Sequence, residues 1–147
     1  MLVSVIITTY NSPNFLAQCL NSFLNQKDKI FEVIVADDGS TEETKILIEK
    51  YKNKLTINHV WHKDEGFRAA KIRNEAVKVS SGEYLVFIDG DCLAFSDFVK
   101  NHKNIAEDGF FARGNRSLLS NSFSKKILNE NTNINLIGKI KLIKLRF

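Results

Sequence analysis

The sequence predicts an α/β fold: a Rossmann-like, doubly wound and mostly parallel sheet. Three observations support this prediction. Short segments rich in β-branched residues alternate four times with helical patterns along the chain. Each of these segments is nearly continuous in its apolar residues, as is usual for strands buried on both faces. The 147 residues, of which 44% are hydrophobic, suffice for one domain with a packed core.

The first part of the pattern contains two strand and helix pairs. Residues 2–8 predict a buried strand, and the Ser-Pro pair at residues 12 and 13 is typical of a helix start. One face of that helix is apolar and comprises Phe15, Leu16, Cys19, Leu20, Phe23 and Leu24. Residues 31–36 predict the second strand, and the capping-box pattern of residues 40–43 predicts the start of the second helix.

The second part of the pattern repeats the alternation. Residues 55–61 and 84–88 predict the third and fourth strands, and helical periodicity predicts helices over residues 68–79 and 96–106. Gly82 follows the first of these helices, and glycine is common just beyond a helix C-terminus. We therefore expect a parallel sheet with helices on both faces.

The pattern changes near the end of the chain. Residues 110–119 predict a fifth strand, and an Asn-rich stretch follows Ser120. We therefore expect a folded domain over residues 1–119 and a polar, then basic, segment over residues 120–147. The last nine residues, 139–147, interleave basic and apolar side chains and contain no acid. This segment could contact an anionic membrane surface weakly, or it could be a helix that packs on a further part of the protein.

Composition excludes several classes of protein. Two cysteines do not form a disulfide framework. The sequence starts directly with a strand pattern, without a signal-type leader, and it contains no apolar run of about 20 residues that could span a bilayer. The formal net charge of +4 is a mild excess and says little about partners. We expect a reduced, cytoplasmic protein, with peripheral attachment at the inner face of the membrane as the alternative.

Polar side chains cluster where the first, second and fourth predicted strands end. In a doubly wound sheet, ligands bind at the carboxyl ends of the strands where the strand order reverses. Asp89 and Asp91 are the sharpest feature, because two carboxylates at the end of a buried strand repel each other. Their hard oxygen atoms suit Mn²⁺ or Mg²⁺ together with ligand phosphates. The alternative is a solvated turn, since Asp-Gly is a common turn dipeptide.

Two further groups have both a ligand-binding and a structural interpretation. Asp37 and Asp38 could accept hydrogen bonds from a ribose or a base, or could belong to a turn that precedes a helix. Arg68, Lys71 and Arg73 lie near a helix start, where cations oppose the helix dipole. They could clamp a diphosphate, or they could form a solvated basic face paired with nearby acids.

Several nucleotide and hydrolase motifs are missing from the sequence. It contains no G-x-G-x-x-G after the first strand, no G-x-x-x-x-G-K-[ST], and no G-x-S-x-G. These absences argue against a dinucleotide cofactor, a P-loop nucleotidase and a nucleophile-elbow hydrolase. Any phosphate is then expected to be held by a metal and side-chain cations.

Four ordered motifs together resemble the amino-terminal half of family 2 glycosyltransferases of the GT-A fold. The motifs are Val-Ser-Val-Ile-Ile-Thr-Thr-Tyr-Asn at 3–11, Val-Ile-Val-Ala-Asp-Asp-Gly-Ser at 33–40, Trp-His-Lys-Asp-Glu-Gly-Phe-Arg at 61–68 leading into Arg73-Asn74, and Phe-Ile-Asp-Gly-Asp-Cys at 87–92. The third motif is similar to the bacterial branch with chondroitin-polymerase-like and galactosyltransferase-like enzymes. The resemblance extends from Leu2 to about Leu119 and implies that residues 1–119 bind a nucleotide sugar.

The resemblance implies a role for each matching residue. It places Thr8 and Tyr10 in the uracil and ribose pocket, with Asp38 bonded to the base and Asp37 beside it. It places Asp89 near ribose or sugar hydroxyls. Arg68, Lys71 and Arg73 would bind the phosphates or the sugar. Asp91, with Asp89, would hold the divalent metal.

The resemblance also implies a reaction and its partners. The expected donor is a UDP-sugar, the acceptor is a glycan or lipid-linked molecule, and transfer inverts the anomeric configuration; no nucleic acid is expected. The family's general base usually lies further downstream, so we cannot name one in this chain. A non-catalytic remnant or one piece of a split enzyme is the alternative. A nucleotidyltransferase is disfavoured, because such enzymes usually carry a glycine-rich loop after the first strand.

Overall fold

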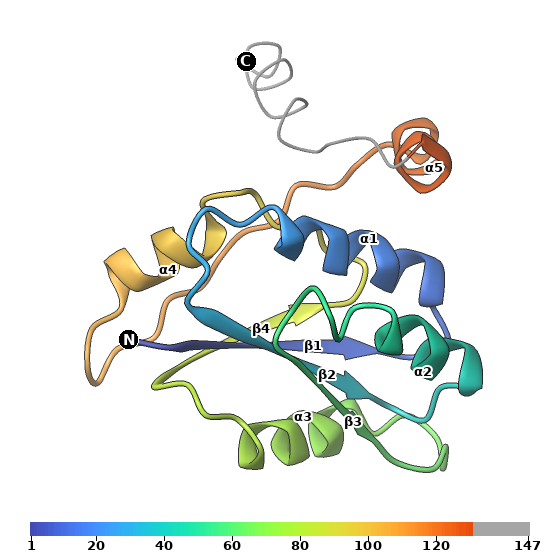
Figure 1. Cartoon of the computed structure of the whole chain (residues 1–147), viewed down its shortest axis with the longest axis horizontal. Coiled ribbons are helices and arrows are strands. Elements are labelled where there is room, and N and C mark those ends of the chain that lie inside the picture. Colours follow the sequence, from blue (N-terminus) through green and yellow to red (C-terminus); the bar gives the residue numbers. More distant parts are fainter. Residues whose placement is uncertain (131–147) are drawn as a thin grey trace.

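Residues 1–130 are built on a four-stranded sheet in which every pair of neighbours is parallel. The computed structural model describes residues 1–130 (Figure 1). The strands are β1 (Val3–Thr9), β2 (Phe31–Asp37), β3 (Ile57–Trp61) and β4 (Tyr84–Asp89). Their order across the sheet is β3-β2-β1-β4. The predicted α/β fold and its first four strands are therefore confirmed.

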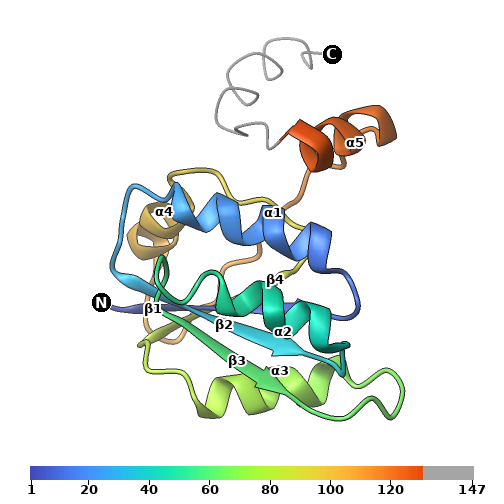
Figure 2. The ribbon, with the colours of Figure 1, turned by 45° about the vertical axis from the view of Figure 1, so that its right-hand side comes forward.

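Helices cover both faces of this sheet. The helices are α1 (Pro13–Leu24), α2 (Glu42–Glu49), α3 (Ala69–Lys78), α4 (Phe98–Ile105) and α5 (Asn121–Glu130). Helices α1, α2 and α4 lie on one face and α3 lies on the other, as Figures 1 and 2 show from two directions. The sequence pattern did not predict α5, which packs against α1.

The strand order explains why α3 lies on the opposite face from α1, α2 and α4. The chain steps from β1 to β2 to β3 in one direction, and then crosses back over the sheet to place β4 beside β1. Crossover connections between parallel strands are right-handed, so a reversal of direction moves the connecting helix to the opposite face. The order therefore reverses between β1 and β4, and a ligand site is expected at the carboxyl ends of these two strands.

The core is divided between the two faces by the alternation of side chains along each strand. In β1, Val3, Val5 and Ile7 point into the larger core under α1, α2 and α4. Ile6 points to the other face and packs with Ile72 of α3. The same alternation points every second side chain of a strand towards α3. Some of the polar residues at the strand ends therefore lie on the α3 side of the sheet.

The predicted fifth strand at residues 110–119 is wrong. These residues have no regular secondary structure, and the side chains of Phe110, Phe111 and Leu118 are 73%, 92% and 90% exposed. A strand needs both a hydrogen-bonded neighbour and a face to bury. Among the described residues β4 pairs only with β1, and the apolar side chains of this segment find no core to enter.

The predicted capping box at residues 40–43 is also wrong. Thr41, not Ser40, precedes the first turn of α2, and no side-chain hydrogen bond caps that helix. The Ser40 hydroxyl instead accepts a hydrogen bond from the backbone N–H of Asn11 at 2.8 Å. The Asn11 side-chain carbonyl in turn accepts one from the backbone N–H of Thr41 at 2.9 Å. Ser40 and Asn11 therefore join the loop after β1 to the loop after β2.

Gly82 has a different role from the one its position suggested. Its φ is not positive, so it is not a left-handed helix cap; its N–H donates to the Ser4 hydroxyl at 2.8 Å. The Ser4 hydroxyl donates to the buried Glu32 carboxylate at 2.6 Å, and the Ser81 N–H donates to the same oxygen. A Cβ on Gly82 would lie 2.6 Å from the Ser4 backbone nitrogen, so only glycine fits here.

We expect Gly82→Ala to lower the free energy of unfolding by about 2 kcal/mol, because the added Cβ meets backbone and a buried polar cluster. Urea unfolding followed by circular dichroism measures this change. Gly114→Ala is the matched control, since a Cβ there has no neighbour within 4 Å, and it should change stability by less than about 0.5 kcal/mol. Equal effects of the two substitutions would contradict the packing role of Gly82.

Two expectations concern membranes. None of the helices within residues 1–130 has the length and the apolar character required to cross a bilayer. The predicted basic amphipathic segment, residues 139–147, lies outside the described residues.

Candidate functional site

Thr8 and Asp89 meet at the point where the strand order reverses. They are register partners at the carboxyl ends of β1 and β4. Arg73 of α3 joins them: its Nε donates to the Thr8 hydroxyl at 2.7 Å, and its Nη2 donates to an Asp89 carboxylate oxygen at 2.9 Å. The planar guanidinium thus fixes both strand ends from the α3 side. Three residues predicted separately from sequence form one connected group.

Asp89 has a second basic neighbour that the sequence did not indicate. Arg116 lies in the irregular segment after α4, and its Nη1 is 3.4 Å from the other Asp89 carboxylate oxygen. No sequence signal could have identified Arg116, because its segment resembled a strand and the contact depends on how that segment returns over the sheet. Asp89 is therefore bracketed by two guanidinium groups, which balance its negative charge.

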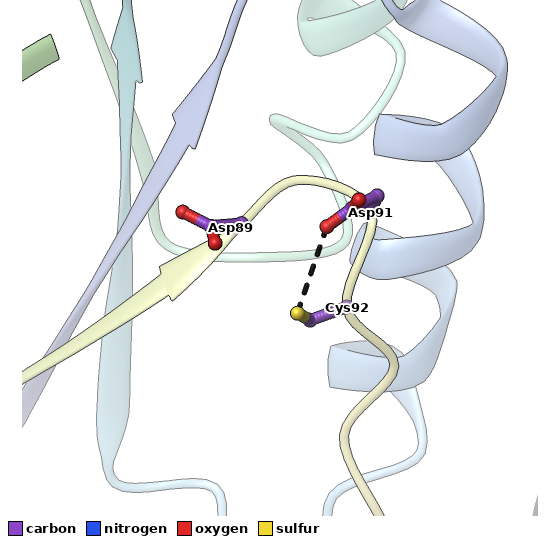
Figure 3. A group of neighbouring side chains, drawn as sticks. All are labelled: Asp89, Asp91 and Cys92. Atoms are coloured by element: carbon purple, nitrogen blue, oxygen red, sulfur yellow. Dashed lines mark hydrogen bonds between the residues drawn. The ribbon is translucent and has the colours of Figure 1, made fainter. Parts of the chain in front are cut away.

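The loop after β4 brings three candidate metal ligands together. Asp89, Asp91 and Cys92 each offer an atom, and these atoms lie within 4.8 Å of one another (Figure 3). Asp91 is exposed, and within residues 1–130 its hydrogen-bond partner is the Cys92 thiol, at the long distance of 3.6 Å. Burial raises the pKa of the Cys92 thiol, so the thiol stays protonated near neutral pH and is a poor ligand. The two carboxylates are the donors that suit Mn²⁺ or Mg²⁺.

The acidic pair at the end of β2 is almost completely buried. Asp37 and Asp38 are 1% and 3% exposed. Asp37 accepts from the backbone N–H of Ser40 at 2.8 Å and contacts His59 Nε2 at 2.9 Å. Asp37 therefore belongs to the turn that precedes α2 as well as to the end of β2, which agrees with the structural interpretation of this acidic pair.

Asp38 holds the start of α3 in place. One of its carboxylate oxygens lies 2.6 Å from Nε2 of His62, and the other accepts from the backbone N–H of Arg68 at 2.9 Å. The sequence marked the segment from Trp61 to Arg68 as a motif, but it gave no sign that His62 contacts Asp38. This contact requires the end of β3 to lie beside β2, as the strand order provides.

Tyr10 and the loop after β3 form the outer wall of this strand-end region. The half-exposed Tyr10 donates its hydroxyl to Asp64 at 2.8 Å, and this bond raises the pKa of the tyrosine. The Gly66 backbone N–H, and then the Tyr10 hydroxyl, lower the pKa of the Asp64 carboxyl. The backbone of Asp64 packs so closely on Gly39 that a Cβ on Gly39 would lie 2.6 Å from the Asp64 Cα. Asp64 thereby links the loops after β1, β2 and β3.

The side chains of the other two predicted cations, Arg68 and Lys71, lie apart from the group formed by Thr8, Arg73 and Asp89. The Arg68 side chain pairs with Glu65 at 2.6 Å and donates to the Lys63 carbonyl at 3.0 Å. Its Nε is buried and has no hydrogen-bond partner. Lys71 is exposed on α3. Of these three basic residues, Arg73 is the one whose side chain contacts the strand ends. The pairing of Arg68 with Glu65 agrees with the alternative of a solvated basic face paired with nearby acids.

Comparison with known proteins identifies what this chain resembles. A model of the family described as "Glycosyl transferase family 2" matches residues 4–141. The chain is 41% identical over 90 residues to a hyaluronan synthase from Pasteurella multocida, and this match covers 60% of the chain and 9% of the synthase.

Two solved structures are similar to the fold. The crystal structure of Staphylococcus aureus TarS 1–349 in complex with UDP-GlcNAc has a TM-score of 0.65 and 37% identity, over 71% of this chain and 30% of that one. The mannosyltransferase PcManGT from Pyrobaculum calidifontis, in complex with GDP-Man and Mn²⁺, has a TM-score of 0.65 and 26% identity, over 72% of this chain and 32% of that one. The chain thus spans less than a third of the length of each of these three proteins.

Proposed function

The chain belongs to glycosyl transferase family 2, and from this premise we propose that it forms the donor-binding part of a metal-dependent, inverting glycosyltransferase. The proposed donor is a UDP-sugar, and the proposed acceptor is a glycan or a lipid-linked molecule. Support for a nucleotide-sugar donor comes from the complexes of the two similar structures with UDP-GlcNAc and with GDP-Man. We propose uridine rather than guanosine as the nucleoside, because TarS shares more sequence identity with this chain than PcManGT does.

One observation carries the proposal: opposite charges converge where the strand order reverses. Asp89 and Asp91 follow β4, and Arg73 reaches the same place from α3. A diphosphate needs cationic partners and a divalent ion needs anionic ones, and this corner supplies both. Thr8 adds a hydroxyl that Arg73 already orients.

The charged residues at the ends of β1 and β4 would stabilise the charge that develops during sugar transfer. When UDP leaves, negative charge grows on its β-phosphate, and a guanidinium that is fixed beforehand stabilises that charge without reorganisation. Arg73 is fixed in this way by Thr8 and Asp89. Asp91 and Asp89 are the residues that would hold Mn²⁺ or Mg²⁺, which as a bound ion supplies Lewis-acid stabilisation of the leaving diphosphate.

Binding and transfer are tested separately. Isothermal titration of the 147-residue chain with UDP, with and without MnCl₂, should show binding that depends on the metal. Absence of binding in both conditions would contradict the proposed function. Binding without transfer to any of a set of glycan acceptors would instead favour the alternative, a nucleotide-sugar-binding module without activity of its own.

Arg73→Lys is expected to weaken UDP binding about tenfold, although it keeps the positive charge. Lysine offers one ammonium group and cannot bridge Thr8 and Asp89 as the two guanidinium nitrogens do. Lys71→Arg, on the exposed face of the same helix, is the control for a basic exchange and should leave the affinity of UDP within about twofold. An unchanged affinity for the Arg73 variant would show that bridging is unimportant.

A further inference from the structure

Thr8 and Thr9, the last two residues of β1, point to opposite faces of the sheet. The Thr8 hydroxyl lies on the α3 side, where it accepts a hydrogen bond from Arg73. Thr9 follows Val5 and Ile7 in the alternation and therefore lies on the α1 side. The Thr9 side chain is 6% exposed, and its hydroxyl has no hydrogen-bond partner in the described part of the chain. One threonine hydroxyl is thus used by the fold, and the other is not.

Fold stability does not explain the choice of threonine at position 9. A buried hydroxyl without a partner is unfavourable, and valine has nearly the same shape without the hydroxyl. The preceding residues on this face, Val5 and Ile7, show that β-branched apolar side chains pack well there. The hydroxyl of Thr9 is therefore a candidate for a role in ligand binding.

The Thr9 side chain lies against the glycine that separates the two candidate metal ligands. The Gly90 backbone N–H donates to the Thr8 carbonyl at 2.8 Å. A Cβ on Gly90 would lie 3.0 Å from that carbonyl oxygen, and 3.3 and 3.4 Å from Cβ and Oγ1 of Thr9. The unpaired hydroxyl therefore packs directly on the turn that joins Asp89 to Asp91.

Asp91 lies on the same side of the sheet as Thr9. The chain that follows Asp91 runs along α1, because the backbone N–H of Ala94 donates to the Ser22 hydroxyl at 3.1 Å. Burial raises the pKa of the Cys19 thiol of α1, and the charge of Asp91 adds to this effect. Both observations place Asp91 near α1, on the side to which Thr9 points.

The two carboxylates of the turn differ in their hydrogen-bond donors. Asp89 accepts from two guanidinium groups. For Asp91 the donor within the described residues is the Cys92 thiol, which is a weak donor and lies 3.6 Å away (Figure 3). A carboxylate that binds a metal ion is normally oriented by a hydrogen bond from a further group. Asp91 thus lacks a strong donor, and the neighbouring hydroxyl of Thr9 lacks an acceptor.

We propose that Thr9 is a positioning residue for the divalent metal: its hydroxyl donates to the carboxylate of Asp91 and orients that carboxylate towards the ion. This inference rests on the proposed function and deepens it, because it adds an orienting partner to the two carboxylates that would hold Mn²⁺ or Mg²⁺. A neutral hydroxyl orients a carboxylate without adding a positive charge that would repel the ion. Loss of such a partner lowers the affinity for a metal by about 10- to 100-fold.

The experiment measures the affinity of the full chain for Mn²⁺ at saturating UDP, from the electron paramagnetic resonance signal of free Mn²⁺. Thr9→Val should lower this affinity by about tenfold or more. The thermal midpoint of Thr9→Val without ligand should stay unchanged or rise, since the unpaired hydroxyl is gone. Thr9→Ser keeps the hydroxyl and should retain the affinity for Mn²⁺ to within about threefold.

Thr44→Val is the matched control. Thr44 of α2 is fully buried, and its hydroxyl also lacks a partner in the described part of the chain. The same exchange there should affect the thermal midpoint in the same direction and should leave the affinity for Mn²⁺ unchanged. A loss of ion affinity in a Thr9 variant that is at least as stable as the wild type is an effect that a purely structural role does not produce.

The outcomes separate this proposal from the proposed function. If the wild type does not bind Mn²⁺ together with UDP, the proposed function fails. If the wild type binds both, and Thr9→Val keeps the ion affinity or loses it together with stability, the positioning role of Thr9 is refuted. Should Thr9→Val fail to fold, Thr9→Ser and Thr9→Ala decide the matter, because serine keeps the hydroxyl and alanine does not. Equal ion affinities of these two variants would also refute the proposal.

Discussion

Asp91→Asn is expected to reduce metal-dependent UDP binding by at least about 100-fold and to abolish any sugar transfer. Asp91 is the exposed carboxylate of the corner, and the described residues provide no cation to pair with it. Asp89 cannot replace it, because Arg73 and Arg116 already contact both of its oxygens. Titration with UDP at a fixed concentration of MnCl₂ measures the effect.

Asp108→Asn is the control for this prediction. It removes the same charge from an exposed position beyond α4 and should leave UDP binding unchanged. The thermal midpoint of the Asp91 variant without ligand should stay close to that of the wild type or rise slightly, since two neighbouring carboxylates no longer repel. A variant that keeps metal-dependent binding would show that Asp91 is not a ligand of the ion.

Gly39→Ala is expected to be the most damaging small substitution in the strand-end loops. The φ of Gly39 is +97°, a conformation that strains any residue with a side chain, and the added Cβ would lie 2.6 Å from the Cα of Asp64. We expect the free energy of unfolding to fall by about 3 kcal/mol. The loop that Asp64 anchors would move, so UDP binding should weaken as well.

Gly66→Ala separates the two causes. Gly66 has a similar φ of +89°, but a Cβ there has no neighbour within 4 Å. This substitution should cost only the backbone strain, about 1 kcal/mol, and should leave UDP binding nearly intact. Urea unfolding of both variants measures the difference. If Gly66→Ala were as destabilising as Gly39→Ala, the close contact with Asp64 would not be the cause.

The fold was predictable because its signals are local. The four strands are continuous apolar segments, and their alternation with helical patterns requires a parallel sheet. The wrong fifth strand at residues 110–119 fails for a non-local reason: a strand depends on a partner, and no pattern within those residues reveals whether one exists. The capping box fails in a related way, because the Ser40 hydroxyl bonds to Asn11, which is 29 residues away.

The candidate site was predictable in its residue types and less so in its connections. The strand-end rule placed Thr8, Asp38 and Asp89 on one edge of the sheet, where they lie. That Arg73 rather than Arg68 reaches Asp89 depends on the rotation of α3 about its axis, which the sequence does not specify. Arg116 depends on the path of an irregular segment, and the roles of all these residues towards a ligand stay predictions.

The bracketing of Asp89 has a consequence for the order in which ligands bind. The charges of Asp89 and Asp91 are nearly offset by those of Arg73 and Arg116, so neither a lone cation nor a lone anion meets a strong field at this place. A divalent ion that binds the two carboxylates would release the guanidinium groups to bind phosphate. Conversely, phosphate that binds the guanidinium groups would release the carboxylates to bind the ion. We therefore expect each ligand to raise the affinity of the other by the same factor, so that the metal ion and the diphosphate bind cooperatively.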